Sequence, residues 1–307
     1  LNNMKIKHLL CFIALCLFFT PGKAQQPSVM TVRNGATVYI WEDKSKPDVF
    51  GMIAFKVGSV DDPEQYTGLA HYLEHVMFKG TQTIDALDWE KEKPIYEKII
   101  AKYDERAALS DPAAREAVDK EINDLTREAA QYAAGNEFSL LVDHMGGQGL
   151  NASTGYDQTE YHNSFPPSQL EKWLEIYSER LIDPVFRGFQ TELEAVYEEY
   201  NMYNDDRGSR MREFIYEQAF GDHPYARPII GLPEHLKNPQ LSKLIDFYNT
   251  WYGPQNMSII LVGNIDAKEA IPMIRDKFER VPRRAEIHRE KKPVRQFKGR
   301  TEKSAKI

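Results

Sequence analysis

The stretch "TGLAHYLEHVMFKGT", residues 67–81, carries two histidines four positions apart, with a glutamate immediately before the second. Residues i and i+4 of a helix lie one turn apart on the same face, so His71 and His75 can bind one metal ion through their imidazole nitrogens. Glu74 follows His71 by three positions and lies on the same side. The stretch therefore predicts a helix with a metal-binding face and an acid beside the metal.

The order of these residues, H-x-x-E-H, is that of the inverzincin zinc peptidases. Zinc lowers the pKa of a bound water to about 7, and a carboxylate such as Glu74 then takes a proton from that water. The product is a nucleophile for a peptide carbonyl, so Glu74 is the candidate general base. The alternative is a chance arrangement on a solvated helix face, because five-residue patterns recur in unrelated proteins.

A catalytic zinc needs a third protein ligand. Both cysteines, Cys11 and Cys16, lie in a segment that we expect to be removed, so this ligand must be a histidine or a carboxylate. The segment "FQTELEAVYEEYNMY" offers Glu192 and Glu199, which are two helical turns apart and share a face. Glu199 could reach the metal, while Glu192 orients a histidine or the ligand. A glutamate-rich surface helix is the alternative, and spacing alone does not choose between them.

The N-terminus is typical of an export signal. Lys5 and Lys7 precede the apolar stretch "HLLCFIALCLFF", and small residues allow cleavage after Ala24. The apolar run is too short to span a bilayer comfortably, so we expect residues 1–24 to be removed and no stable membrane span to remain. The protein is therefore expected in the periplasm or outside the cell.

The charge is unevenly distributed along the 307 residues. Residues 25–282 contain 26 Lys and Arg against 43 Asp and Glu, whereas residues 283–307 contain 10 basic and 3 acidic side chains. An acidic body repels phosphate backbones, so nucleic acid is not an expected partner. We interpret the basic end as a solvated linker or the start of a following domain, with binding to an anionic surface as the alternative.

The order of strand-like and helix-like segments predicts an α+β fold with a largely antiparallel sheet packed by helices. Asn34-Gly35 between two β-rich runs indicates a hairpin over 28–41. Further strands are expected at 49–59, 146–165 and 258–263, the second of these ranges holding two. Helices are expected at 167–182, 188–205 and 267–279.

Residues from about 87 to 134 differ in character from the rest of the chain. They are charged and alanine-rich, with apolar residues at helical spacing, and Ser110-Asp111-Pro112 supplies a break with a helix cap. The segment predicts an antiparallel helical hairpin, closed at its end by Gly135-Asn136. The sequence leaves three roles open for this hairpin. It could cover the active site, recruit a partner, or be a solvated addition without a specific role.

Several motifs together resemble the family of pitrilysin, insulin-degrading enzyme and mitochondrial processing peptidase. "GLAHYLEHVMFKGT" is similar to the zinc helix of that family, "GGQGLNASTGYDQTEYH" to the strand pair bordering its active site, and "ELEAVYEEYNM" to the helix with its distal glutamates. The segments "HPYARPIIGLPEHL" and "YNTWYGPQNMSIILVGNID" extend the resemblance, which runs over residues from about 29 to 280.

The resemblance implies a zinc metallopeptidase domain over residues 25–282 that hydrolyses peptides or unfolded polypeptides. It assigns one Zn²⁺ per chain to His71, His75 and Glu199. It also makes Glu74 the general base and Glu192 the supporting acid.

The resemblance further assigns the strand edge at Asn151 and Ala152 to substrate binding. In the family, this edge pairs with extended peptide through main-chain hydrogen bonds, which hold the substrate with little side-chain selectivity. A turn-forming role after Gly149 is the alternative for Asn151.

Two departures from the family pattern bear on activity. His75 and Glu199 are 124 positions apart, more than is usual in the family, and the helical hairpin accounts for the excess. The family is usually built from two or more related domains, and the Arg and Tyr of its later domain have no counterpart here. We therefore expect a second homologous domain or subunit to close the site. The alternative function is a non-catalytic or partner-dependent subunit or scaffold that binds or presents peptide.

Overall fold

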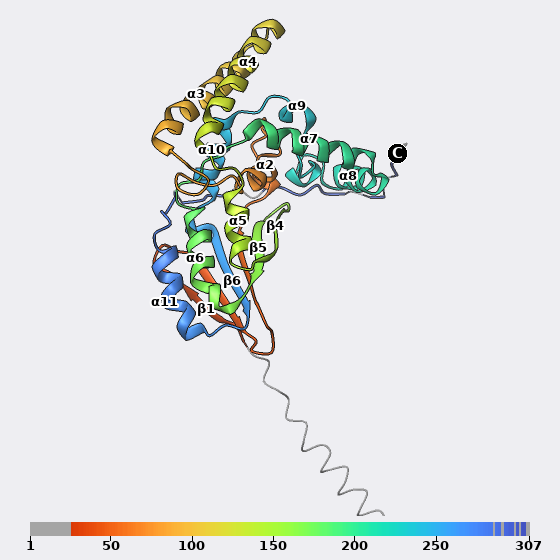
Figure 1. Ribbon diagram of the computed structural model, residues 1–307. Coiled ribbons are helices and arrows are strands. Elements are labelled where there is room, and N and C mark those ends of the chain that lie inside the picture. The colour runs from red at the N-terminus through yellow and green to blue at the C-terminus, as the bar shows by residue number, and fades with distance from the viewer. Residues whose placement is uncertain (1–25, 285, 290–291, 298, 301, 305–307) are drawn as a thin grey trace, which may run out of the picture.

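The computed structural model describes residues 26–284, 286–289, 292–297, 299–300 and 302–304. A six-stranded sheet with helices stacked against it forms the body, and two pairs of helices project from this body (Figure 1). The expected export signal at residues 1–24 lies outside the described residues. Those residues after 282 that are described form neither helix nor strand.

The elements follow one another in a mixed order along the chain. The strands are β1 (Ser28–Thr31), β2 (Thr37–Glu42), β3 (Val49–Phe55), β4 (Gln148–Thr154), β5 (Thr159–Phe165) and β6 (Met257–Gly263). The α-helices are α2 (Leu69–Val76), α3 (Trp89–Ala108), α4 (Pro112–Ala129), α5 (Glu137–His144), α6 (Leu170–Glu179), α7 (Phe189–Asp205), α8 (Arg207–Phe220), α9 (Pro233–Leu236), α10 (Leu241–Trp251) and α11 (Ala267–Phe278). Short 3₁₀ turns include η2 (Ala130–Tyr132) and η4 (Pro224–Ala226).

The sheet has the strand order β1-β2-β6-β3-β5-β4. Among the strands of the described residues, β2 and β6 run parallel, and the other four neighbouring pairs are antiparallel. This arrangement confirms the predicted α+β fold and the hairpin over 28–41. Strand β4 lies at one edge, so one side of its backbone has no strand partner within the described part of the chain.

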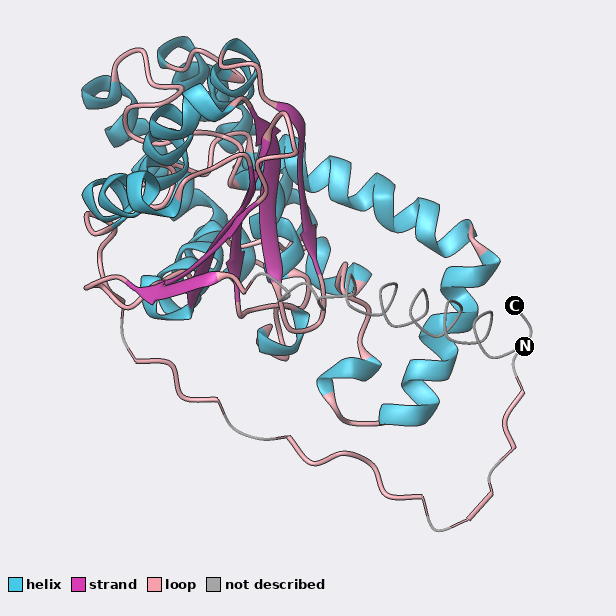
Figure 2. Ribbon diagram, turned by 90° about the horizontal axis from the view of Figure 1, so that it is seen from below, coloured by secondary structure: helices cyan, strands magenta, loops and turns pink. Residues whose placement is uncertain are grey.

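One face of the sheet packs against helices (Figure 2). Side chains along β3, β5 and β6 alternate between buried and more accessible, as the two-residue period of a strand requires. Gly51 of β3 lets Trp173 of α6 lie against the sheet, because a Cβ at this position would stand 2.5 Å from the indole. Trp173 Nε1 donates a hydrogen bond of 2.8 Å to Asn163 Oδ1 on β5.

The opposite face carries a row of side chains, apolar or aromatic except for His162, that reaches across the sheet. The pairing register brings Val29, Tyr39, Ile260, Met52 and His162 side by side on neighbouring strands. Val29 is 57% exposed and Tyr39 38% exposed. We call this surface the open sheet face. Helices of the described residues cover it less than they cover the other face.

Helix α2 is held at its start by a buried carboxylate. Asp62 accepts hydrogen bonds from the backbone N–H groups of Gly68 (2.7 Å) and Ala70 (2.9 Å), which a first helical turn leaves unpaired. Gly68 has φ 89°, and a Cβ there would stand 2.6 Å from the carbonyl oxygen of Ile230. Burial raises the pKa of Asp62 to about 7, against the effect of the two N–H donors. These contacts fix the direction in which α2 enters the site.

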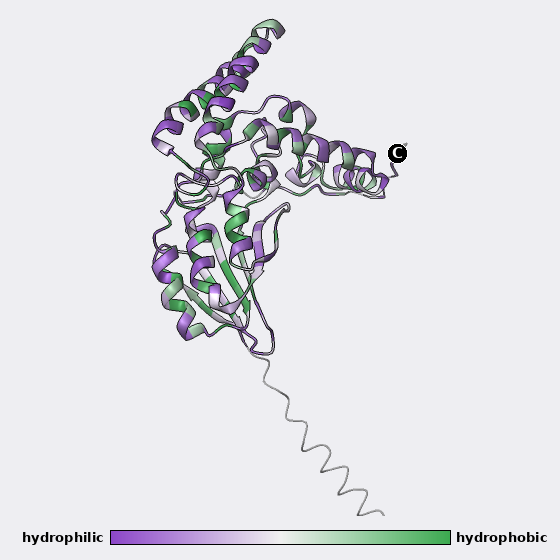
Figure 3. Cartoon of the chain, in the orientation of Figure 1, coloured by the Kyte–Doolittle hydropathy of each residue, from purple (hydrophilic) through white to green (hydrophobic). Residues whose placement is uncertain are grey.

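Helices α3 and α4 form the predicted helical hairpin, which projects from the body and is largely hydrophilic along its length (Figures 1 and 3). Lys102 and Glu121 pair across it at 2.6 Å, and Asp111 caps α4 by accepting from Ala114 N at 2.9 Å. The predicted closure at Gly135-Asn136 is wrong. Helix α4 ends earlier and continues as η2, and Asn136 (φ 66°) immediately precedes α5, a helix that the sequence did not indicate.

Among the described residues, no helix combines the length and the apolar composition that crossing a membrane demands.

Candidate metal centre

His71, His75 and Glu199 converge although α2 and α7 are far apart in the chain. The Nε2 atoms of His71 and His75 lie 3.5 Å and 3.6 Å from the same carboxylate oxygen, Oε2 of Glu199. Candidate ligand atoms of the three residues all lie within 4.8 Å of one another. The structure therefore brings together the three side chains that the family resemblance assigns to one metal.

Glu192 is not one of the three candidate ligands but contacts one of them, His75. Its Oε2 is 3.4 Å from Nδ1 of His75, and its Oε1 is 2.6 Å from the Lys79 ammonium. A carboxylate on Nδ1 fixes the tautomer of a histidine and directs Nε2 to the metal position. Glu192 thus occupies the place expected of a supporting acid, with Lys79 balancing its charge.

The charges of the site reflect burial and mutual contact. Burial lowers the pKa of His71 to about 4, so this imidazole is neutral and its nitrogen is free to ligate. Burial also disfavours the charged form of His75, but the hydrogen bonds with Glu192 and Glu199 outweigh it and raise the pKa to about 9. The hydrogen bond with His75 holds the pKa of Glu199 below its ordinary value, and the same is true of Glu192.

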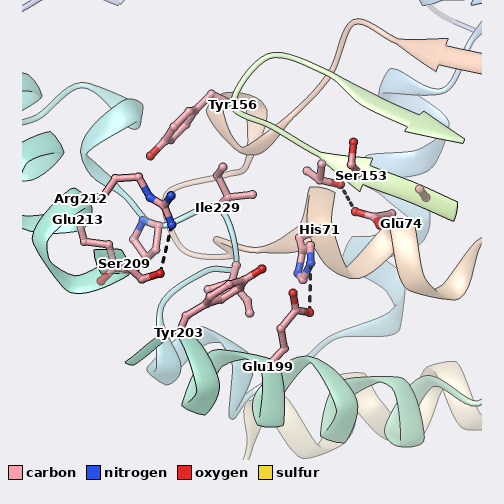
Figure 4. Close-up of a pocket in the computed structure, with 14 residues that line it drawn as sticks. His71, Glu74, Ser153, Tyr156, Glu199, Tyr203, Ser209, Arg212, Glu213 and Ile229 are labelled. Atoms are coloured by element: carbon pink, nitrogen blue, oxygen red, sulfur yellow. Dashed lines mark hydrogen bonds and ion pairs between the residues drawn. The ribbon is translucent and has the colours of Figure 1, made fainter. Parts of the chain in front are cut away.

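Glu74 lines the same cleft as His71 and Glu199 (Figure 4). Burial raises the pKa of Glu74, which makes the carboxylate a stronger base than an exposed glutamate. The hydroxyl of Thr154, the last residue of β4, donates a hydrogen bond of 2.6 Å to Glu74 Oε2. One carboxylate oxygen is therefore anchored to the edge strand.

A cleft of about 410 Å³ opens in front of these residues. Tyr203 from the end of α7 and Arg212 from α8 line the cleft, and the ring of Tyr156 stacks on Tyr216 of α8 at 5.4 Å. Ser153 lines the cleft beside Glu74, away from Arg212 (Figure 4). Pro228, Ile229 and Ile230 also line it. Arg212 Nη2 donates to the Ser209 hydroxyl at 3.2 Å.

The predicted substrate edge lies along this cleft. Asn151 and Ala152 are on β4, the edge strand, and Ala152 lines the cleft. The Ala152 N–H donates to the side-chain oxygen of Asn151 at 2.9 Å. Asn151 pairs with His162 in the strand register and is not a turn residue, although Gly149 just before it has φ 64°.

The three candidate ligands are of the types that coordinate zinc in catalytic sites. Two imidazoles and one carboxylate are a known three-ligand set, and the cleft leaves space for a fourth ligand. His71 Nδ1 is buried and has no hydrogen-bond partner among the described residues, so the imidazole is held by packing and by its Nε2 side. The residues present fit a zinc ion held by His71, His75 and Glu199.

The sequence belongs to the insulinase family of peptidases, peptidase family M16, whose model matches residues 37–93 and 125–232. The model of the peptidase M16 inactive domain matches residues 240–306. The first match is interrupted over residues 94–124, which lie within α3, α4 and the turn between them.

Relatives of this chain carry the name of zinc proteases. The probable zinc protease PqqL of Escherichia coli is 26% identical over 261 residues, covering 81% of this chain and 22% of PqqL. The zinc protease PqqE of Helicobacter pylori is 24% identical over 254 residues, covering 81% of this chain and 46% of PqqE. The chain thus spans less than half the length of either relative.

Solved structures share the fold. The first half of the periplasmic protease PqqL from Escherichia coli superposes with a TM-score of 0.67 at 23% identity, over 88% of this chain and 49% of that structure. Pitrilysin gives a TM-score of 0.65 at 22% identity, over 89% of this chain and 25% of that structure. At these identities the likeness establishes the fold alone.

Sequence reasoning missed several side chains of the cleft. Thr154 was not singled out, although its position two residues after Ala152 places both on one face of the strand. Tyr203 follows Glu199 by four positions, a helical spacing that could have indicated it. Arg212 had no such signal, because nothing in the sequence shows that α8 folds back along α7.

Proposed function

We propose that this chain is the metal-binding half of an exported zinc metalloendopeptidase that hydrolyses peptides or unfolded polypeptides. The observation that carries the proposal is the convergence of His71, His75 and Glu199 on one point beside Glu74. Two relatives named as zinc proteases support it, as does membership of the peptidase family.

In this proposal His71, His75 and Glu199 hold one Zn²⁺ per chain, which when bound polarises the scissile carbonyl and lowers the pKa of water. Glu74 accepts a proton from a water in the cleft and delivers it to the nitrogen of the departing amine. Thr154 holds the carboxylate of Glu74 in place, and Glu192 keeps His75 oriented. Thr154 and Glu192 thus each hold another side chain in place, Thr154 through its hydrogen bond to Glu74 and Glu192 through its contact with His75.

Substrate would bind as an extended strand along β4. The edge of the sheet offers main-chain groups at Asn151 and Ala152, and added strands gain affinity from such groups with little side-chain selectivity. The cleft lies against this edge, so a peptide paired with β4 passes Glu74. Broad selectivity for extended chains follows from this mode of binding.

A second homologous domain or subunit would close the cleft from the other side. The relatives are more than twice as long as the matched region, and the cleft is open to solvent in this chain. Export to the periplasm or the exterior is supported by the N-terminal pattern and by the periplasmic relative PqqL. We accordingly assign hydrolysis to the assembled protein.

The test compares the parent with Glu74→Gln in the complete protein, and with Glu198→Gln as a control on the exposed side of α7. Zinc should approach one ion per chain in all three. Hydrolysis of an unfolded protein should fall by at least about 100-fold in Glu74→Gln alone, the size of a general acid–base contribution. Normal cleavage by Glu74→Gln would refute the assigned base, and a parent without zinc would refute the site.

A further inference from the structure

The inserted hairpin contacts the first turn of the helix that carries two residues of the metal centre. Phe189, the first residue of α7, lies between Tyr72 of α2 and Tyr103 of α3, with ring centroids 4.8 Å and 4.7 Å away. All three aromatic side chains are buried. The Tyr72 hydroxyl donates to the Phe189 carbonyl, and the Tyr103 hydroxyl donates to Gln190 Oε1 at 3.3 Å.

The residues just before α7 are attached to the same hairpin. Arg187 makes a two-pronged ion pair with Glu92 in the first turn of α3, at 2.6 Å and 2.8 Å. Their side chains are 9% and 2% exposed, so this pair is shielded from solvent. Arg187 also donates to the carbonyl of Lys79 at 3.2 Å, beyond the end of α2. The entry into α7 is thereby tied to both α2 and α3.

These contacts lie at the start of α7, the helix that carries Glu192 and Glu199. Glu192 lies one turn after Phe189 and Glu199 two turns further, on the side facing α2. A small rotation of the first turn of α7 would move both carboxylates relative to the histidines. Tyr103 belongs to the segment 94–124 that the family model does not match, so the insertion adds a contact of its own.

We propose that Tyr103, on the inserted hairpin, is a positioning residue for the metal centre: through Phe189 and Gln190 it fixes the first turn of α7 and thus the direction of Glu192 and Glu199. The hairpin is then part of the scaffold of the site and not a solvated decoration. This inference rests on the proposed zinc site and extends it to a segment beyond the family pattern.

The test measures zinc dissociation constants by chelator competition, together with thermal stability, for Tyr103→Ala, Tyr103→Phe and Ile122→Ala. Ile122 is 2% exposed on α4, whose main helical contacts are with α3 and η2, so its truncation is expected to loosen the hairpin away from the contact with α7. Tyr103→Ala should weaken zinc binding about tenfold, as the loss of an outer contact does at metal sites. Tyr103→Phe keeps the ring against Phe189 and should bind zinc nearly as tightly as the parent.

The comparison separates positioning from stability. Ile122→Ala should lower the melting temperature yet keep the zinc affinity of the parent. Parent-like affinity in Tyr103→Ala, or an equal loss of affinity in both alanine variants, would overturn the inference. Tyr103→Leu, which retains more of the buried volume, replaces Tyr103→Ala if that variant does not fold. A parent chain that binds no zinc would instead refute the proposed function, which keeps the two failures distinct.

Discussion

The hydroxyl of Thr154 donates a hydrogen bond of 2.6 Å to the carboxylate of Glu74, joining the end of the edge strand to the candidate base. The bond crosses from β4 to α2, so the element proposed to hold substrate also holds the acid proposed to act on it. A shift of β4 would move the base with it. This coupling gives the first of four predictions.

Replacing Thr154 by valine should lower kcat/KM about tenfold while leaving the zinc content unchanged. Valine keeps the shape of threonine but removes the donor, and a hydrogen bond to a charged group contributes roughly 1.5–3 kcal/mol. Ser153→Ala is the matched control, because the Ser153 hydroxyl donates to Glu160 and not to Glu74. Equal losses in the two variants would contradict a specific role for the Thr154 bond.

Replacing Glu192 by glutamine should weaken zinc binding by about 10- to 100-fold, the usual effect of losing an outer-sphere carboxylate. Glutamine leaves Lys79 without its partner at 2.6 Å and weakens the hold on Nδ1 of His75. Chelator competition measures the change, with Glu198→Gln on the exposed side of α7 as the control. Unchanged affinity in Glu192→Gln would show that His75 is oriented by other contacts.

Replacing Arg180 by lysine should lower the free energy of unfolding by about 2 kcal/mol or more. The guanidinium is buried against the rings of Phe138 (4.4 Å) and Tyr161 (4.5 Å) and donates to the Met77 carbonyl at 3.1 Å. An ammonium group cannot stack on these rings and would stay buried. Arg180→Met fills similar space without a charge and should lose less, which urea titration can measure. A greater loss in the methionine variant would contradict the expectation that the unstacked, buried ammonium group is the more destabilising replacement.

The buried carboxylate of Asp62 should make stability depend on pH. Its folded pKa of about 7 lies above the value of an unfolded aspartate, so the folded state binds more protons between pH 4 and pH 7. The free energy of unfolding contributed by this group therefore falls as pH rises through that window. Asp62→Asn cannot ionise, so its stability relative to the parent should improve by up to a few kcal/mol from pH 4 to pH 7. A difference that does not change with pH would contradict the raised pKa.

The local patterns of the sequence were sufficient for the fold class and for grouping the metal-site residues within each of the two helices. His71 and His75 share a face through their spacing, and Glu192 and Glu199 through theirs, because helical periodicity is a local property. That the two helices meet depended on the resemblance to the family, since spacing within each helix says nothing about the distance between them. Whether the grouped residues bind zinc and catalyse hydrolysis remains a prediction.

The features that sequence reasoning missed depend on tertiary contacts. Helix α5 was overlooked because Gly135-Asn136 is equally compatible with the end of one helix and the start of the next. Thr154 can donate its hydrogen bond to Glu74 only because β4 lies against α2 in the folded chain. Arg180 is an ordinary charged residue in the sequence, and only the folded chain surrounds it with aromatic rings.

The open sheet face has a consequence for the colloidal behaviour of the chain. Val29, Tyr39 and their neighbours leave an apolar strip in contact with water, and covering such a surface releases roughly 25 cal/mol for each Å². The unpaired backbone at the sheet edges adds a second source of adhesion. We therefore expect this chain to aggregate when it is isolated at laboratory concentrations. A binding partner that covers the open sheet face should keep it in solution.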